Sequence, residues 1–442
     1  MVKNALEPSW EARFEGTSYG FRPGRSAQDA IGKIYQLSRP NKRKKWVVDA
    51  DIEGAFDNID HEHLLKTIGP APGRELVRRW LQAGYVDRGV FHPTDAGTPQ
   101  GGVISPLLAN VALHGLEAAM GVAHNGRGEI CSQRAVVKYA DDLVVFCESR
   151  EDALAAIDDL KVWLAERGLK LSREKTRVVH LTEGFDFLGF NVRQYPAPTT
   201  SRTGYKLLIK PSKASVRRIR TELREEWQRL VGQPIGTVIK TLNPIIRGQA
   251  NYFRTQVASE TFASLDHWMF LRQLRWARRT HSTKPWGWRR SRYWGRLTQR
   301  RDQWVFGDKH IGAFLWKYSW FPIERHVLVR GRSSKDDPDL ADYWAAREQA
   351  KASSLKPSAR TIARAQNCLC DVCGESLLNG EELNRIRPQW KSRRPGADID
   401  PALRHLACQQ IHRMRRERVV RDLLEPDVVK VARPVLRGEH GR

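Results

Sequence analysis

The sequence predicts an α+β protein in three parts: a mixed N-terminal domain, a helical second domain and a small C-terminal module. Apolar, strand-like runs alternate with helical stretches over roughly the first 195 residues. Residues 210–301 are basic, rich in tryptophan and helical in character. Four of the six cysteines follow residue 365 and indicate a separate small module.

The balance of charge favours a polyanionic partner. The chain has 442 residues, 40% of them hydrophobic, and a formal net charge of +25. Such an excess of Lys and Arg suits nucleic acid or an anionic membrane surface. No apolar run approaches the length that crosses a bilayer, and the N-terminus does not resemble a signal peptide. We therefore expect a cytosolic, nucleic-acid-binding protein with no membrane partner and, because cysteines are few, no disulfide scaffold.

Four apolar runs of the first domain are predicted strands: 46–52, 135–147, 176–181 and 187–192. Residues 195–203, with two prolines and several Ser and Thr, predict a turn or hairpin tip. Asp51 lies near the end of the first run, whereas Asp141 and Asp142 lie in the middle of the second. Aspartates inside a buried strand are costly, so we expect a hairpin turn that exposes them at its tip.

Carboxylates at two such tips predict a site for divalent cations. If the tips meet, Asp51 and Asp141 share hard cations through oxygen ligands. Two such ions activate the attacking hydroxyl and stabilise the leaving group in phosphoryl or nucleotidyl transfer. The alternative reading of Asp141-Asp142 is an ordinary solvated turn.

The segment Tyr139-Ala-Asp-Asp142, about ninety residues after the carboxylate-rich segment 51–57, resembles the palm of reverse transcriptases. The resemblance implies that Asp51, Asp141 and Asp142 are catalytic and hold two Mg²⁺ ions, together with the backbone carbonyl of Ile52. It also implies that Phe56 is the aromatic gate that excludes a 2′ hydroxyl on the incoming nucleotide. The nearby Asp49 and Asp57 match no metal position.

Further segments, 18–27, 97–110, 168–176 and 185–190, resemble reverse transcriptase blocks in the order found in group II intron-encoded enzymes. The resemblance implies that Arg22 and Arg25 contact phosphates, that Gln100 lies near the nascent base pair, and that Lys175 lies near the template–primer or the nucleotide. Family members carry a longer N-terminal fingers region. The chain is therefore expected to be a truncated copy, a gene fragment, or one half of a split protein whose fingers come from a second chain.

Residues 240–253 resemble the maturase-specific domain of group II intron proteins, and aromatic and basic residues alternate over 267–296. Arginines contact phosphates, and aromatic rings stack on unpaired bases or form a core. The basic face is the stronger indication, because a tryptophan is more often buried than a base platform. The residues expected to bind RNA are Arg247, Asn251, Tyr252, Arg272, Arg275, Arg278 and Arg279.

The C-terminal cysteines predict one structural zinc ion. Cys370 and Cys373 form one ligand pair, and His405 and Cys408 form another about thirty residues later. The spare candidates Cys368 and His412 leave one ligand open.

The module resembles an HNH endonuclease. Where that family has catalytic histidines, this chain has Asn384 and Arg385 after Glu382, and Gln409 after the last cysteine. Asn and Arg do not act as general bases near neutral pH, so we expect DNA cleavage to be lost and the zinc fold to remain.

The resemblance implies a right-hand polymerase palm followed by a helical thumb and a zinc-binding HNH-like module. The implied domains are partial fingers and palm (1–200), thumb and maturase-specific domain (205–305), connecting DNA-binding region (306–362), HNH-like module (363–415) and charged tail (416–442). Segments 322–326 and 336–344 match the connecting region.

The implied function is RNA-directed DNA synthesis and intron maturation in a bacterial-type cytosol or nucleoid. The implied partners are intron RNA, target DNA and deoxynucleoside triphosphates. The first alternative is a catalytically silent RNA-binding splicing factor. The second is an RNA-dependent RNA polymerase, which Phe56 and the maturase-like segment disfavour.

Overall fold

The structure is a computed structural model of the chain. It describes residues 1–98, 101–126, 128–198, 202–298, 300–310, 312–351, 355, 357–366, 368–372, 374, 377–378, 383–386, 402–405 and 408. The chain divides into two compact units, which are treated separately below. The first comprises Met1–Arg218, Phe253–Ala258 and Ile323–Trp344, and the second comprises Ile219–Tyr252, Ser259–Pro322 and Ala345–Arg442.

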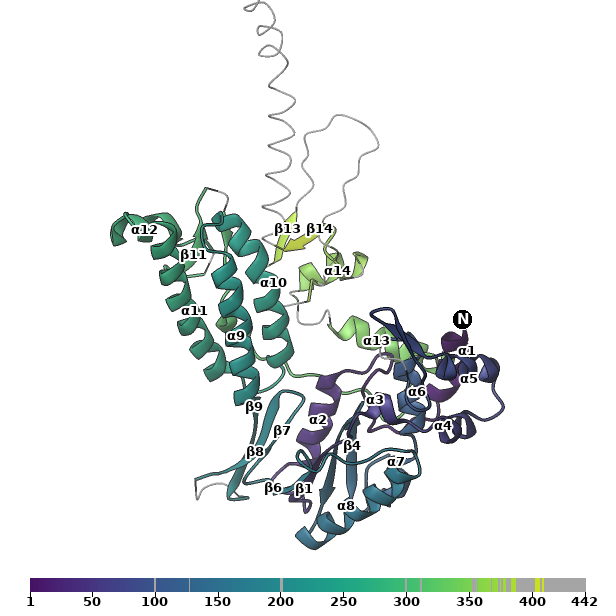
Figure 1. The fold of residues 1–442 in the computed structure, drawn as a ribbon. Helices are drawn as coiled ribbons and strands as arrows, with labels where there is room; N and C mark the ends of the chain where they lie inside the picture. The colour runs from purple at the N-terminus through teal and green to yellow at the C-terminus, as the bar shows by residue number, and fades with distance from the viewer. Residues whose placement is uncertain are drawn as a thin grey trace, which may run out of the picture. The chain divides into compact units, whose positions relative to one another are not determined.

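The first unit is built around a four-stranded antiparallel sheet in the order β4-β5-β1-β6. Figure 1 labels β1, β4 and β6 of this sheet. Its strands are β1 (Trp46–Asp51), β4 (Ala135–Tyr139), β5 (Asp142–Cys147) and β6 (Arg177–His180). The predicted run 135–147 is therefore two strands joined by a tight turn, as the paired aspartates suggested. Runs 46–52 and 176–181 are confirmed as β1 and β6.

The sheet is buried on both faces. Val48 and Val145 belong to one core with Ala153, Ala156 and Leu160 of helix α8 (Arg150–Ala165), which packs on β1 and β5. Helix α2 (Ala27–Leu37) packs against β4. Both helices begin at a serine, Ser149 or Ser26, whose side chain accepts a backbone hydrogen bond and so satisfies a free helix donor.

A second sheet of the first unit has the order β7-β8-β9. The prediction of one strand over 187–192 is wrong, because the chain turns at Leu188 and Gly189 between β7 (Phe185–Phe187) and β8 (Phe190–Pro196). Both turn residues have positive φ, 47° and 77°, as a two-residue hairpin turn requires. The predicted hairpin tip at 195–203 is confirmed by the pairing of β8 with β9 (Tyr205–Pro211), although residues 199–201 lie outside the described part.

The remaining elements of the first unit are mostly short helices. They are α1 (Val2–Glu11), α3 (Ala55–Asn58), α4 (His61–Ile68), α5 (Arg74–Gln82), β2 (Tyr85–Asp87), β3 (Val90–His92), α6 (Ser105–Ala112), α7 (Leu116–Ala119) and the 3-10 turn η2 (Pro338–Leu340).

The second unit is mainly helical, as its composition predicts, and its long helices run side by side in Figure 1. These are α9 (Lys213–Arg229, which begins in the first unit), α10 (Ile235–Phe253) and α11 (Ser259–Thr280). Trp227 and Trp276 are buried between them with Phe306. No described helix is both long and apolar enough to span a lipid bilayer.

Smaller elements complete the second unit. They are α12 (Trp286–Tyr293), β10 (Trp294–Gly295), β11 (Val305–Asp308), β12 (Ala313–Phe314), η1 (Tyr318–Trp320), α13 (Ala341–Lys351, which begins in the first unit), α14 (Pro357–Ala365), β13 (Leu383–Ile386) and β14 (Ala402–His405).

Candidate functional site

The three predicted catalytic aspartates come together at one end of the main sheet. Asp51, the last residue of β1, is directly opposite Asp142, the first residue of β5. Asp141 occupies the turn between β4 and β5 together with Ala140, whose φ of 57° is in the left-handed region. The turn thus carries one carboxylate and delivers a second to the strand beside Asp51.

Residues 17–20 support this turn from the edge of the sheet. Tyr19 N–H donates to the Lys138 carbonyl, and Lys138 N–H donates to the Thr17 carbonyl, both at 2.9 Å. A Cβ atom at Gly20 would lie 2.3 Å from the Ala140 nitrogen, so only glycine permits this close approach. Asn110 Nδ2 donates to the Gly20 carbonyl at 2.8 Å and holds it in place.

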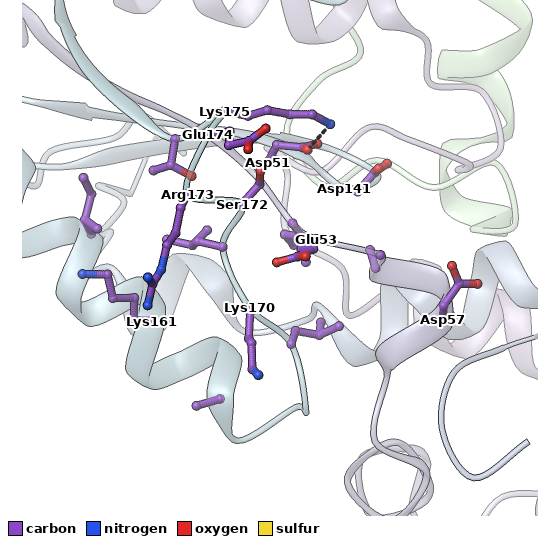
Figure 2. A pocket seen from close by; sticks show the side chains of 18 of the residues that line it. Asp51, Glu53, Asp57, Asp141, Lys161, Lys170, Ser172, Arg173, Glu174 and Lys175 are labelled. Atoms are coloured by element: carbon purple, nitrogen blue, oxygen red, sulfur yellow. Dashed lines mark hydrogen bonds and ion pairs between the residues drawn. The ribbon is translucent and has the colours of Figure 1, made fainter.

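A cleft of about 1200 Å³, here called the Asp51 cleft, opens beside the aspartates. Its lining includes Asp51, Ile52, Phe56, Asp141 and Lys175, all of which the sequence singled out. Figure 2 shows the Lys175 amine reaching over Asp51, with Asp141 close by and Asp57 well apart. The Lys175 Nζ lies 2.6 Å from Asp51 Oδ2.

The electrostatics of the cleft reflect crowded negative charge. Burial raises the pKa of Asp142 to about 6, and the charges of Asp141 and Asp51 act in the same direction. The hydrogen bond to Asp51 raises the pKa of Lys175. Lys175 therefore places a positive charge among the crowded carboxylates, and it forms an ion pair with Asp51.

The neighbouring Asp49 has a different environment. Burial raises its pKa, but Arg177 Nη2 lies 2.9 Å from its carboxylate and pairs with it. This ion pair supports the expectation that Asp49 is structural rather than a metal ligand.

The backbone of Ile52 is oriented by the segment that precedes β6. Glu53 N–H donates to the Lys170 carbonyl, and Ser172 N–H donates to the Asp51 carbonyl, both at 2.9 Å. In this antiparallel bridge Ile52 faces Leu171 as the non-hydrogen-bonded pair, so its own carbonyl points to the opposite side, where β5 lies. That orientation suits a metal ligand.

Phe56 is half-buried, and its ring packs edge-to-face against the ring of Phe21, with 6.0 Å between the ring centres. The segment of the Gln100 block contacts the backbone at Phe56, since Thr98 N–H donates to the Phe56 carbonyl at 2.6 Å. Gly97 has a φ of 83°, and a Cβ there would lie 2.6 Å from that carbonyl oxygen. Gln100 itself lies outside the described residues.

Arg22 and Arg25, expected at phosphates, are enclosed within the first unit. The Arg22 side chain has no exposed surface and pairs with buried Glu11 at 2.9 Å. Arg25 donates to the carbonyls of Gly16 and Gly331 at 3.3 and 2.7 Å. Guanidinium groups with these internal partners favour a structural role over phosphate contact.

Three basic residues of the Asp51 cleft were not singled out by sequence: Lys161, Lys170 and Arg173 (Figure 2). Lys170 and Arg173 belong to the block 168–176, so its resemblance could have indicated them. Lys161 lies on α8 and carries no local signal, because only the packing of that helix brings it to the cleft.

In the second unit, helices α9 and α11 form a basic groove. Its lining includes Arg224, Arg272, Arg275 and Arg279 together with buried Trp227 and Trp276. Burial and the charges of the other arginines lower the pKa of Arg272. Arg278 is exposed but does not line this groove. The structure thus brings three of the four predicted arginines of α11 together and adds Arg224.

The predicted residues of α10 are half-buried. The Arg247 guanidinium lies 5.9 Å from the centre of the Trp316 ring, and Asn251 and Tyr252 follow one helical turn later. Buried Asn243, in the same segment, donates to the Phe314 carbonyl and accepts from Trp316 N–H, each at 3.0 Å. This part of the maturase-like segment therefore positions the strand β12 and its flank.

The C-terminal module brings three predicted zinc ligands together. One ligand atom from each of Cys370, His405 and Cys408 lies within 4.8 Å of the others, and no other group of this kind occurs among the described residues. Cys408 Sγ lies 3.8 Å from His405 Nδ1. Ligands of one tetrahedral zinc ion are about 3.6 Å apart, so these residues fit the ion. Cys373, His412 and Glu382 lie outside the described part.

Comparison with known families agrees with this geometry. Residues 1–192 match the reverse transcriptase (RNA-dependent DNA polymerase) family. Residues 216–294 match the maturase-specific domain of group II introns. The sheet with its three aspartates is therefore that of a reverse transcriptase, a fold of mixed helix and sheet. The two matches follow one another along the chain in the order that the sequence motifs predict for group II intron reverse transcriptases and maturases.

Curated relatives match part of the chain. Protein YkfC of Escherichia coli is 33% identical over 217 residues, which cover 42% of this chain and 57% of YkfC. The group II intron-encoded protein LtrA of Lactococcus lactis is 30% identical over 263 residues, 46% of this chain and 43% of LtrA. The chain thus spans about half the length of the curated relatives it matches.

Among solved structures, telomerase from Candida albicans covers 63% of this chain and 50% of its own, at 14% sequence identity and a TM-score of 0.36. A likeness at this level adds no argument about function.

Proposed function

We propose that the protein is an RNA-directed DNA polymerase and maturase of a group II intron. The observation that carries the polymerase proposal is the placement of Asp51 opposite Asp142, beside a turn that presents Asp141 to the same cleft. Carboxylates gathered in this way suit two Mg²⁺ ions, which would supply activation of the primer 3′ hydroxyl and stabilisation of the leaving pyrophosphate. The raised pKa of Asp142 supports this, because such crowding favours divalent cations.

Each residue of the site then has a proposed role. Asp51, Asp141, Asp142 and the Ile52 carbonyl would hold the two ions. Lys175 would leave Asp51 when a metal ion binds and turn its ammonium toward the nucleotide or template–primer. Phe56 and Gln100 would shape the space for the incoming nucleotide and its base pair.

The second unit would bind intron RNA and so assist splicing. Arg272, Arg275 and Arg279 line one groove, where their charges attract phosphates. Arg278, Arg247, Asn251 and Tyr252 are proposed as further contacts. The buried Trp276 belongs to the core, whereas the exposed Trp286 and Trp288 are proposed to stack on bases.

The C-terminal module would hold one structural zinc ion through Cys370, Cys373, His405 and Cys408. Convergence of three of the four supports this ligand set. With Asn384 and Arg385 in place of catalytic histidines, we propose that the module contributes structure without DNA cleavage.

Primer extension on an RNA template with Mg²⁺ tests the polymerase proposal. We expect extension by the full chain and its loss, by at least about a hundredfold, in Asp141→Asn, which removes a metal ligand. The exposed Glu183→Gln removes an equal charge away from the cleft and is expected to leave extension intact. Extension that survives in Asp141→Asn would contradict the proposal.

A second candidate function is a silent RNA-binding splicing factor. It is favoured by the second unit, whose basic groove is independent of the aspartates. Failure of the unaltered chain to extend any primer, with RNA binding retained, would support it.

Substitutions of arginines in the basic groove test the proposed RNA binding. We expect Arg275→Gln/Arg279→Gln to weaken intron RNA binding by about tenfold and to flatten its salt dependence, because fewer counterions are released. The exposed pair Arg296→Gln/Arg301→Gln removes the same charge outside the groove and should have a smaller effect. Equal losses from the two pairs, measured by filter binding, would mean that the groove has no special role.

A further inference from the structure

A second cavity of the first unit lies away from the Asp51 cleft. Its volume is about 710 Å³. It is lined by residues 16, 17 and 19, by the end of helix α2 and the residues after it, by residues 124, 125 and 128–130, and by residues 328–332 of the strap, which is defined here as Ile323–Trp344. It shares no lining residue with the Asp51 cleft. The strap carries the sequence segments that so far have no role in the proposed function.

The lining of this cavity is strongly basic. It contains five cationic side chains, Lys33, Arg39, Lys42, Arg330 and Arg332, and one carboxylate, that of Glu129. Glu129 accepts a hydrogen bond from Asn125 Nδ2 at 3.1 Å. Among the described residues that line the cavity, the Lys, Arg and Glu side chains give five positive charges and one negative charge, a formal sum of +4.

Lys33 is the innermost of these cations. Its side chain is half-buried, and burial lowers the pKa of its ammonium. Within the described part of the chain this ammonium has neither a hydrogen bond nor an ion pair, and the carboxylates of Glu117 and Glu129 act on it only at longer range. A half-buried cation without a direct partner is a ready site for an anionic ligand.

The turn that presents Arg330 and Arg332 is held firmly by the first unit. Arg25 donates to the Gly331 and Ser333 carbonyls at 2.7 and 3.3 Å. The Asp29 carboxylate accepts from Val329 N–H at 2.8 Å. The exposed side chains of Arg330 and Arg332 thus project from a fixed backbone, which reduces the entropy lost on binding.

We propose that this cavity binds the phosphodiester backbone of a single nucleic-acid strand, with Lys33 as the central contact and Arg330 and Arg332 as the strap's contribution. The volume lies in the range of pockets for small ligands, roughly 300–1,000 Å³, and so takes a short stretch of one strand rather than a double helix. We expect the bound strand to be RNA, although single-stranded DNA carries the same backbone charge. Arg25 is then a positioning residue that builds the site without touching the ligand.

Fluorescence anisotropy with short labelled oligo(U) and oligo(dT) tests this site in the full chain. We expect Arg330→Gln/Arg332→Gln to weaken oligo(U) binding by about tenfold at moderate salt. The slope of log K against log[KCl] should fall by about 1.4, because each phosphate contact on a single strand contributes about 0.7. Repeating the measurement with Arg275→Gln/Arg279→Gln present prevents the groove of the second unit from masking the effect.

The control pair Lys66→Gln/Arg150→Gln removes two exposed cations of the first unit outside the cavity. The proposal would be overturned if the control pair weakened oligo(U) binding as much as the strap pair, Arg330→Gln/Arg332→Gln. Lys33→Met keeps an apolar stem in place, and a normal thermal melt with weakened binding would separate a lost contact from misfolding. Equal losses for oligo(U) and oligo(dT) assign the contacts to phosphates alone, whereas a larger loss for oligo(U) adds a contact to the 2′ hydroxyl.

This test is independent of the chemistry at Asp51. Asp141→Asn should abolish primer extension and leave oligo(U) binding unchanged, whereas the strap pair should weaken oligo(U) binding in either background. Failure of the polymerase proposal therefore leaves this one standing, and the reverse also holds.

Discussion

At the residue scale, the main unfavourable interaction is the repulsion among the neighbouring carboxylates of the first unit. Asp142 has a raised pKa because it is partly buried and faces the charges of Asp141 and Asp51. Lys175 offsets part of this charge through its ion pair with Asp51. Grouped charge of this kind is common at functional sites, and it agrees with the proposal that divalent cations bind here.

The first prediction concerns Asp142→Asn. In the unaltered chain the pKa of the Asp142 carboxyl is about 6 in the folded state, above the unfolded value of roughly 3.9, so the fold disfavours the ionised form of Asp142. That destabilisation is absent below the unfolded pKa, grows as pH rises, and is complete above about 6. Without divalent cations at about pH 8, we expect the variant to gain roughly 1–2 kcal/mol after allowance for solvent screening, or roughly 3–5 °C in Tm.

Differential scanning calorimetry over a pH series checks this prediction. The gain should shrink as pH falls from about 8 toward 4. The exposed Glu183→Gln serves as the charge-matched control and should show no such trend. A gain independent of pH would mean that the effect comes from packing rather than from charge.

At the element scale, the β4–β5 hairpin is shaped by segments distant in sequence. Ala140 adopts a positive φ that a non-glycine residue adopts only at a conformational cost. Residues 17–20 hold this turn through backbone hydrogen bonds and through the close packing of Gly20 on Ala140. The placement of Asp141 therefore depends on a glycine about 120 residues earlier.

The second prediction is that Gly20→Ala displaces this hairpin. The added Cβ would meet the Ala140 nitrogen at 2.3 Å and the Tyr139 carbonyl carbon at 2.9 Å, and both are backbone atoms. Overpacking of this kind costs about 1–3 kcal/mol, and we expect primer extension to fall by at least about tenfold. Urea unfolding and primer extension measure the two effects.

Gly126→Ala is the control for this change, because a Cβ there meets nothing within 4 Å and the φ is not positive. It should leave both stability and extension near those of the unaltered chain. Normal behaviour of Gly20→Ala would show that the hairpin tolerates displacement.

At the scale of the whole molecule, the two units are not consecutive in sequence. The strap returns to the first unit after the helical part of the second, and Asp29 receives hydrogen bonds from His326 and Val329. The first unit is thus held together by contacts between residues about 300 apart in sequence. The Cys–His cluster belongs to a small separate core formed by Ile362, Leu377 and Leu403.

The third prediction is that zinc stabilises only this small core. The purified chain should contain about one zinc ion, and His405→Ala should lose it, because three ligand atoms converge there. A chelator should lower the first of two thermal transitions and leave the second unchanged. The exposed Cys131→Ser is a thiol control and should retain full zinc content, as measured by atomic absorption.

The sequence alone determined the elements that follow from local pattern. An apolar run with Asp51 near its end predicted β1, and a second run with two aspartates in its middle predicted the β4–β5 hairpin, because burying carboxylates inside a strand is costly. The short spacings within the pairs Cys370/Cys373 and His405/Cys408 predicted a ligand cluster, and three of these four residues come together among the described residues. The order of the motifs predicted the two family matches, to reverse transcriptases and to the maturase-specific domain.

Only the tertiary structure decided what depends on distant contacts. Arg22 and Arg25 resemble surface arginines in sequence, but their partners Glu11 and Gly331 enclose them. The support of Asp141 by Gly20, the Lys175–Asp51 ion pair and the cavity beneath the strap likewise join residues far apart in the chain. No local periodicity records such pairings, because they arise when separate elements pack against one another.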